Sequence, residues 1–233
     1  FCFALVQLFY EWNWEKAYKS FHKALEINPG SADVHYTYAL YLIAMGRLRE
    51  ALVEVEQAHT LDPLSLPINM QLGSTYYYLR RFDDALEQYK KTIELDQSFR
   101  SALYGMGWTY LSKGDTESAI EVIIKAQKQA GSDLKGVAAL GYAYAKAGEI
   151  EKAEDCIQKL MKRKELDMQV SLNMDLAIVY AGLKNYDKVF HYLELAYEDR
   201  SGGMIFLNVH PEWSAQIKSD PRFKLLIQKM GLV

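Results

Sequence analysis

A short pattern returns along this sequence at a constant interval of 34 residues. Its most regular position is an alanine that occurs five times in register: Ala17, Ala51, Ala85, Ala119 and Ala153. Glycines and tyrosines keep the same interval: Gly73, Gly107, Gly141, Tyr76, Tyr110 and Tyr144. Self-similarity at a fixed period is typical of solenoids, in which each repeat packs on its neighbours. One stacked array would account for all 233 residues, so no second domain is needed.

Within one period the apolar residues predict two helices. Leu103, Met106 and Tyr110 are three or four residues apart, so they share one face of a first helix. The breakers "KGD" separate it from a second helix, on which Ala119 and Ile123 share a face. Small residues on both helices would let the two backbones approach closely. A larger side chain at Ala119 is therefore expected to overpack this contact, at a cost of ~1–3 kcal/mol.

A 34-residue helix–turn–helix unit with small residues at these positions, a late tyrosine in the first helix and a proline near its end resembles the tetratricopeptide repeat. The resemblance implies an all-α fold, a right-handed α-solenoid of about six repeats with a C-terminal capping helix. The first repeat is truncated, and the sixth is displaced by two residues, with Val189 in place of the alanine. The expected repeats are about 1–31, 32–65, 66–99, 100–133, 134–168 and 170–203.

Residues 204–233 leave the repeat pattern and are expected to form a cap. Asp220 suits an N-cap, Pro221 suits the first helical position, and Gly231 suits the residue beyond the helix. The residues between them place one apolar stripe on this helix: Phe223, Leu226, Ile227 and Met230. We favour a helix that covers the last repeat, and a docking helix for another protein is the alternative.

The tail from residue 186 onward carries a second, narrower resemblance. Together with "FYEWNWEKAYKSFHKALEINP" at residues 9–29, it is similar to the C-terminal repeat regions of bacterial multidomain regulators. In those proteins the repeats follow a winged-helix, nucleotide cyclase or protein kinase domain. The resemblance implies a regulatory or interaction module with such a domain upstream. The chain begins with Phe1 rather than Met, so we expect that it is part of a longer protein.

The charge balance argues against a nucleic-acid partner. The net charge is −3, from 27 Lys and Arg against 30 Asp and Glu, whereas nucleic-acid-binding domains usually carry a basic excess. The first ten residues are apolar but too few to span a bilayer, so we expect no membrane insertion. One basic cluster is interpreted as a solvated helix end: Lys159, Lys162, Arg163 and Lys164.

No residue pattern in the chain points to catalysis, a metal or a cofactor. Cys2 and Cys156 lie outside any CxxC pairing, which favours a reducing compartment such as the cytoplasm. His35 falls at a core-facing helical position and is interpreted as a satisfied buried histidine. Asp83 and Asp84 are interpreted as the charged first turn of a helix. Because nucleophile motifs and phosphate-binding loops are missing from the sequence, we expect a protein that is not an enzyme and needs no cofactor.

The family resemblance implies that the first helices line a concave groove, with ligand contacts commonly at repeat offsets 2, 5, 9, 12 and 13. At about 100° per residue, offsets 5, 9 and 12 point away from the core positions of the same helix. The side chains at these offsets are almost all apolar or aromatic, and none at offsets 5, 9 and 12 is charged. The candidate groove residues are Tyr36, Leu40, Met70, Tyr77, Tyr78, Tyr104, Trp108, Tyr142, Met174 and Ile178.

Two interpretations of this stripe stay open. The first helices could pack on one another and bury it, which applies above all to the aliphatic residues. For the aromatic residues we favour a binding role, because Tyr and Trp dominate interface hot spots. Lys135 and Lys146 are the basic residues on this face, so the set of Lys, Arg and Asn that would clamp an acidic C-terminal peptide is incomplete.

The sequence therefore predicts a non-catalytic scaffold that binds a peptide or helix in an aromatic, uncharged groove. The partner is either another protein or a segment of the same full-length protein, and the setting is a bacterial signalling or transcription regulator. Two alternatives are a fragment of an enzyme such as an adenylate or guanylate cyclase with the catalytic domain upstream, and a sensor domain for a small ligand. The sequence leaves the oligomeric state open.

Overall fold

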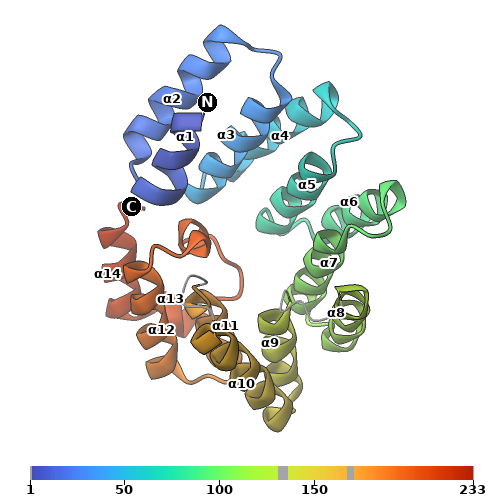
Figure 1. The fold of residues 1–233 in the computed structure, drawn as a ribbon, viewed down its shortest axis with the longest axis vertical. Coiled ribbons are helices and arrows are strands. Elements are labelled where there is room, and N and C mark those ends of the chain that lie inside the picture. The colour runs from blue at the N-terminus through green and yellow to red at the C-terminus, as the bar shows by residue number, and fades with distance from the viewer. Residues whose placement is uncertain (1, 131–135, 167–170, 233) are drawn as a thin grey trace. The chain divides into compact units, whose positions relative to one another are not determined.

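The computed structural model describes residues 2–130, 136–166 and 171–232. In these ranges the chain is helical and contains no strand, as the all-α prediction requires (Figure 1). None of the helices in the same ranges is long and apolar enough to cross a membrane. The helices are α1 (Cys2–Val6), α2 (Trp14–Ile27), α3 (Ala32–Ala44), α4 (Leu48–Leu61), α5 (Leu66–Tyr78), α6 (Phe82–Leu95), α7 (Arg100–Lys113), α8 (Thr116–Ala130), α9 (Val137–Ala147), α10 (Ile150–Leu166), α11 (Asn173–Gly182), α12 (Tyr186–Glu198), α13 (Ala215–Ser219) and α14 (Pro221–Lys229).

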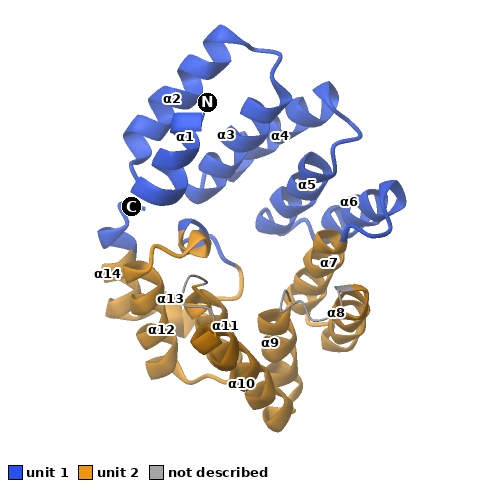
Figure 2. Cartoon of the chain, in the orientation of Figure 1, with its two compact units in different colours: residues 1–99, 205–210, 227–233 blue, residues 100–204, 211–226 orange. Residues whose placement is uncertain are grey.

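The chain forms two compact units, which are coloured separately in Figure 2. The first compact unit contains residues 1–99, 205–210 and 227–233, and the second contains residues 100–204 and 211–226. The stretch after α12, which begins with a 3-10 turn at Gly202–Phe206, therefore contributes to both of them. The expected repeat boundaries at 133–134 and 168–170 lie outside the described residues.

Neighbouring helices pack as pairs of a first and a second helix. The pairs are α3 with α4 and α5 with α6 in the first compact unit, and α7 with α8, α9 with α10 and α11 with α12 in the second. Each pair falls within one expected repeat. The predicted helix–turn–helix architecture is therefore confirmed.

Small residues bring the two helices of a pair into close contact. The five recurrent alanines, Ala17 to Ala153, each have 0% exposure. A Cβ added to Gly73 on α5 would lie 2.5 Å from the Tyr89 ring, and one added to Gly107 on α7 would lie 2.5 Å from Ile123 Cγ1. Both distances are far below van der Waals contact, so the first helix can approach the second only because these positions lack a side chain.

The turn inside each repeat uses a residue in the left-handed conformation. This position has positive φ in all six expected repeats, with φ 80° at Gly148 and φ 57° at Lys184. Glycine adopts such a φ freely, whereas an L side chain costs roughly 1–2 kcal/mol there. The turn residues are Trp12, Gly46, Arg80, Gly114, Gly148 and Lys184.

The turn of the sixth expected repeat comes two residues later than the 34-residue period, and the preceding second helix is longer than its counterpart in the third repeat. Lys184 follows Gly148 by 36 residues rather than 34, and α10 has 17 residues where α6 has 14. Val189 takes the place of the recurrent alanine and has 0% exposure. The larger valine is therefore fully buried in the displaced repeat, as the alanine is in the others.

The expected C-terminal helix is α14, which begins at Pro221. The Asp220 carboxylate accepts a hydrogen bond from the Arg222 backbone N–H at 2.8 Å, and Gly231 follows the helix with φ 66°. Phe223 and Leu226 on its apolar stripe are buried. Start, stop and stripe thus agree with the sequence prediction.

We expect Gly107→Ala to destabilise the chain by about 1–3 kcal/mol, because the new methyl group overlaps Ile123 at the α7–α8 contact. Urea denaturation followed by circular dichroism measures this loss. Gly202→Ala is the matched control, since a Cβ there meets no atom within 4 Å. Equal stability of the two variants would contradict the close-contact argument.

Lys184→Gly is expected to stabilise the chain by roughly 0.5–1 kcal/mol, because glycine relieves the left-handed strain of an exposed lysine. The reciprocal change Gly148→Lys should lower the free energy of unfolding by a similar amount. Thermal and urea midpoints of both variants measure these two changes in stability. If both variants shift the midpoint in the same direction, left-handed strain at the turn position is not the cause.

Candidate functional site on the first helices

The first-helix face is defined here as repeat offsets 5, 9, 12 and 13 on α3, α5, α7, α9 and α11. Apolar residues surround most of these helices, whereas the second helices α4, α6, α8, α10 and α12 are amphipathic. A helix that is apolar all round is covered by other atoms on most of its sides. The second helix buries one side of the first helix. The apolar side chains of the first-helix face must therefore be buried by other residues.

The ten predicted groove residues divide into two groups by exposure. None of them is fully exposed. The half-buried group is Tyr36, Leu40, Met70, Tyr78, Tyr104 and Trp108. The buried group is Tyr77, Tyr142, Met174 and Ile178.

In the first compact unit, two neighbouring tyrosines at the end of α5 point to different partners. The Tyr77 ring packs 6.2 Å from Phe82, at the start of the second helix of its own pair. The Tyr78 ring instead stacks on Phe206, with ring centroids 5.9 Å apart and planes 23° apart. Burial raises the pKa of the Tyr78 hydroxyl. Tyr78 therefore contacts a residue that lies outside the repeats.

In the second compact unit, two hydroxyl groups of the first-helix face meet one carboxylate. Ser112 Oγ on α7 donates a hydrogen bond to Glu212 Oε1 at 2.7 Å. The Tyr142 hydroxyl on α9 also hydrogen-bonds to Glu212, and burial, followed by the Glu212 charge, raises the pKa of Tyr142. Trp108 packs against Tyr142, with ring centroids 5.8 Å apart. Glu212 has only 8% exposure, so this is a buried carboxylate held by hydroxyl donors.

The residues that make these contacts belong to what we call the C-terminal segment, Gly203–Trp213. A fourth contact links it to α11, since a Cβ on Gly203 would lie 3.0 Å from Met174 Cγ. Met204, Ile205 and Leu207 in this segment have no exposed surface. The C-terminal segment thus lies against the first-helix face in each compact unit.

Sequence reasoning missed Ser112, Phe206 and Glu212 as members of the site. A signal for them was available, because the 34-residue pattern stops at residue 203 and "MIFLNVHPEW" is apolar without helical periodicity. Such a run must be covered by something, yet its partners cannot be read from the sequence alone. Lys135 lies outside the described residues, and Lys146 is exposed on α9.

The histidines and aspartates singled out in the sequence have structural partners. His35 Nδ1 lies 2.6 Å from Glu54 Oε2, and His35 Nε2 lies 2.9 Å from the Pro29 carbonyl oxygen. Asp83 and Asp84 occupy the first turn of α6. Among the described residues, no group of three or more His, Cys, Asp or Glu side chains could hold a metal ion.

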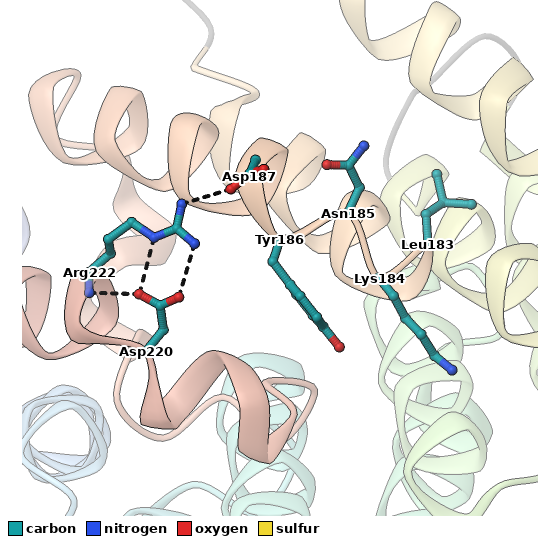
Figure 3. Close-up of a pocket in the computed structure, with 7 residues that line it drawn as sticks. All are labelled: Leu183, Lys184, Asn185, Tyr186, Asp187, Asp220 and Arg222. Carbon is teal, nitrogen blue, oxygen red and sulfur yellow. Dashed lines mark hydrogen bonds and ion pairs between the residues drawn. The ribbon is translucent and has the colours of Figure 1, made fainter.

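A shallow cavity of ≈ 580 Å³ lies in the second compact unit, at the turn between α11 and α12 (Figure 3). Arg222 forms ion pairs there with Asp187 at 3.0 Å and Asp220 at 2.9 Å, and its guanidinium lies 4.2 Å from the centre of the Phe190 ring. Hydrogen bonds from Arg222 lower the pKa of Asp220. The arrangement fixes the start of α14, which is a structural role.

A carboxyl group on α11 makes stability depend on pH. Burial raises the pKa of Asp175 to about 6, from an ordinary value near 4. Unfolded chains release this proton as pH rises from about 4, whereas the folded chain resists release until about pH 6. The folded state therefore loses stability across that window.

Asp175→Asn is expected to remove this loss and to stabilise the chain at pH 7.5 by up to about 3 kcal/mol, since each pKa unit corresponds to about 1.4 kcal/mol. At pH 4 the gain should vanish. Urea titrations at both pH values measure it, with the exposed Asp155→Asn as control. A gain of equal size at both pH values would contradict the role of ionisation.

Comparison with known protein families agrees with the geometry. Models described as tetratricopeptide repeat match residues 8–65, 70–133 and 136–165, which together make up more than half of the chain. A structure of PilF from Pseudomonas aeruginosa covers 88% of this chain and 92% of its own, with a TM-score of 0.57. Its 18% sequence identity makes this a likeness of fold alone.

Two relatives of known name also match in sequence. The BBSome complex member BBS4 of Bos taurus is 28% identical over 116 residues, which are 50% of this chain and 22% of the relative. Hsp70-Hsp90 organizing protein 2 of Arabidopsis thaliana is 26% identical over 98 residues, which are 42% of this chain and 17% of the relative. The chain spans less than a quarter of the length of either relative. From its three matching stretches and its helical pairs, the chain belongs to the tetratricopeptide repeat family.

Proposed function

We propose that this chain is a non-catalytic protein-interaction scaffold whose first-helix face binds a segment of polypeptide. The observation that carries this proposal is that the C-terminal segment already packs against that face. Glu212 is held by Ser112 and Tyr142, and Phe206 stacks on Tyr78. A surface that binds an irregular stretch of its own chain has the shape and the chemistry to bind a segment of another polypeptide.

The composition of the face supports a polypeptide as its ligand. Tyr104 and Trp108 on α7 are large, rigid rings that are half-buried, so each keeps part of its surface available. Rings of this kind bury much apolar area at a small cost in side-chain entropy. Hydroxyl groups of Ser and Tyr add directional hydrogen bonds beside them.

The relatives support a role in assembly. One relative is described as a member of a complex, and another as an organizing protein for two other proteins. Transfer of this role to the present chain is part of the proposal, because most of each relative lies outside the match. The incomplete set of basic residues at the groove offsets argues that an acidic C-terminus is not the bound feature.

We further propose a regulatory setting for the scaffold. The tail and the first repeat are similar to the repeat regions of bacterial multidomain regulators, in which a catalytic or DNA-binding domain precedes the repeats. In such a protein the scaffold would act in the cytoplasm, and its ligand would be either a partner protein or another part of the same protein. The sequence of the gene upstream of Phe1 tests this setting directly.

Trp108→Ala is expected to weaken partner binding by ~2 kcal/mol or more, about thirtyfold, because it removes a central aromatic contact. Proteins captured on the immobilised chain are identified by mass spectrometry, and their affinity is then measured by calorimetry. Melting temperature and helicity should change little, since Trp108 is only half-buried.

Val53→Ala is the control for this experiment, because Val53 is an exposed apolar residue on the second helix α4. It should leave the affinity unchanged. If Trp108→Ala unfolds the chain, the ring is part of the core and the proposed binding face is wrong. If both variants bind equally well, the partner uses another surface.

A further inference from the structure

The C-terminal segment contacts the first helices at the offsets where ligands of this repeat are expected. Tyr78 and Ser112 are both at offset 13, in the third and fourth repeats. Tyr142 is at offset 9 of the fifth repeat, and Met174 is at offset 5 of the sixth. The Tyr78 contact lies within the first compact unit and the other three lie within the second. In each compact unit, independently of the other, the C-terminal segment therefore contacts a first helix at an expected ligand offset.

The contacts have a defined chemistry. One is aromatic stacking, between Phe206 and Tyr78. Another is the capture of a carboxylate, since Ser112 and Tyr142 both hydrogen-bond to Glu212. A buried carboxylate is costly unless donors compensate its lost hydration, and hydrogen bonds to a charged group are about twice as strong as neutral ones. The pair Ser112 and Tyr142 thus selects for an acidic side chain.

The C-terminal segment is built like a tethered peptide rather than like a repeat. It starts after Gly202, where an added Cβ would meet no atom within 4 Å, and it continues through one 3-10 turn and then turns without a helix as far as Trp213. The regular helix α13 begins only at Ala215. Displacement of the segment would therefore break no helix of the repeats.

We propose that the C-terminal segment is a displaceable internal ligand of the first-helix face. Its external competitor is a peptide segment that offers a glutamate to Ser112 and Tyr142 in the second compact unit. This inference rests on the proposed function and adds to it the chemistry of the partner and a reason why the face is closed in the free protein.

A tethered ligand competes at an effective concentration of roughly millimolar. The apparent affinity of an external peptide is reduced by the fraction of chains in which the face is free. Weakening the internal contact by a given factor should raise the affinity of the external peptide by up to the same factor. A substitution that weakens the internal contact should therefore raise the affinity of the chain for an external peptide. If the contact had only a structural role, its loss would not raise this affinity.

The test uses a fluorescein-labelled peptide of sequence GMIFLNVHPEW, which copies residues 203–213, and fluorescence anisotropy with the full chain. We expect Glu212→Gln to bind this peptide at least tenfold more tightly than the unchanged chain. Adding Tyr142→Phe to that variant, or replacing the glutamate of the peptide by glutamine, should remove most of the gain. Glu194→Gln, at an exposed glutamate on α12, is the matched control and should show no gain.

Hydrogen exchange of the unchanged chain provides a second measurement that needs no variant. If the C-terminal segment is displaceable, its amides should exchange at least tenfold faster than those of α7 and α9. Exchange of the segment only at the rate of global unfolding would overturn the inference, as would a folded Glu212→Gln variant that binds no peptide. If either result occurs while Trp108→Ala still loses its partner, the scaffold function stands and only the internal ligand is rejected.

Discussion

The close approach of two helices within each repeat is the constraint on which the rest of the structure depends. In the third to fifth repeats it depends on a glycine of the first helix, which is Gly73, Gly107 or Gly141, and on a fully buried alanine of the second. Because the second helix covers one side of the first at short range, the opposite side of the first helix is left for a different cover. The first-helix face is therefore a direct result of the packing inside the repeat.

Burial of the first helices also requires that their polar groups be satisfied locally. Thr75 and Thr109 have no exposed surface, and each donates its hydroxyl hydrogen bond to the backbone carbonyl four residues earlier, at 2.8 Å. The two positions are one period apart. Such bonds let a threonine lie in an apolar contact without an unpaired group. Glu212 is satisfied differently, by donors from two separate helices, which makes its position depend on tertiary contacts.

The fold could be predicted from the sequence because its determinants are local and periodic. The turn at Gly148 and the cap at Asp220 are each encoded within a few residues, and the displacement of the sixth repeat shows in the spacing of Tyr180. The candidate site was harder to predict. Helical offsets identified a face, but they could not separate Tyr77, which packs on its own helical pair, from Tyr78, which meets Phe206. The latter contact joins residues 128 positions apart, and a non-periodic segment carries no local signal for its partner.

The contrast between the two cysteines has a practical result. Cys156 is buried on α10 beside Gly141, and burial raises the pKa of its thiol, so the reactive thiolate form is scarce. Cys2 is exposed on α1. Of the two cysteines of this chain, one thus offers an accessible thiol to maleimide reagents, and a fluorophore or spin label can be placed on α1 without first engineering the sequence.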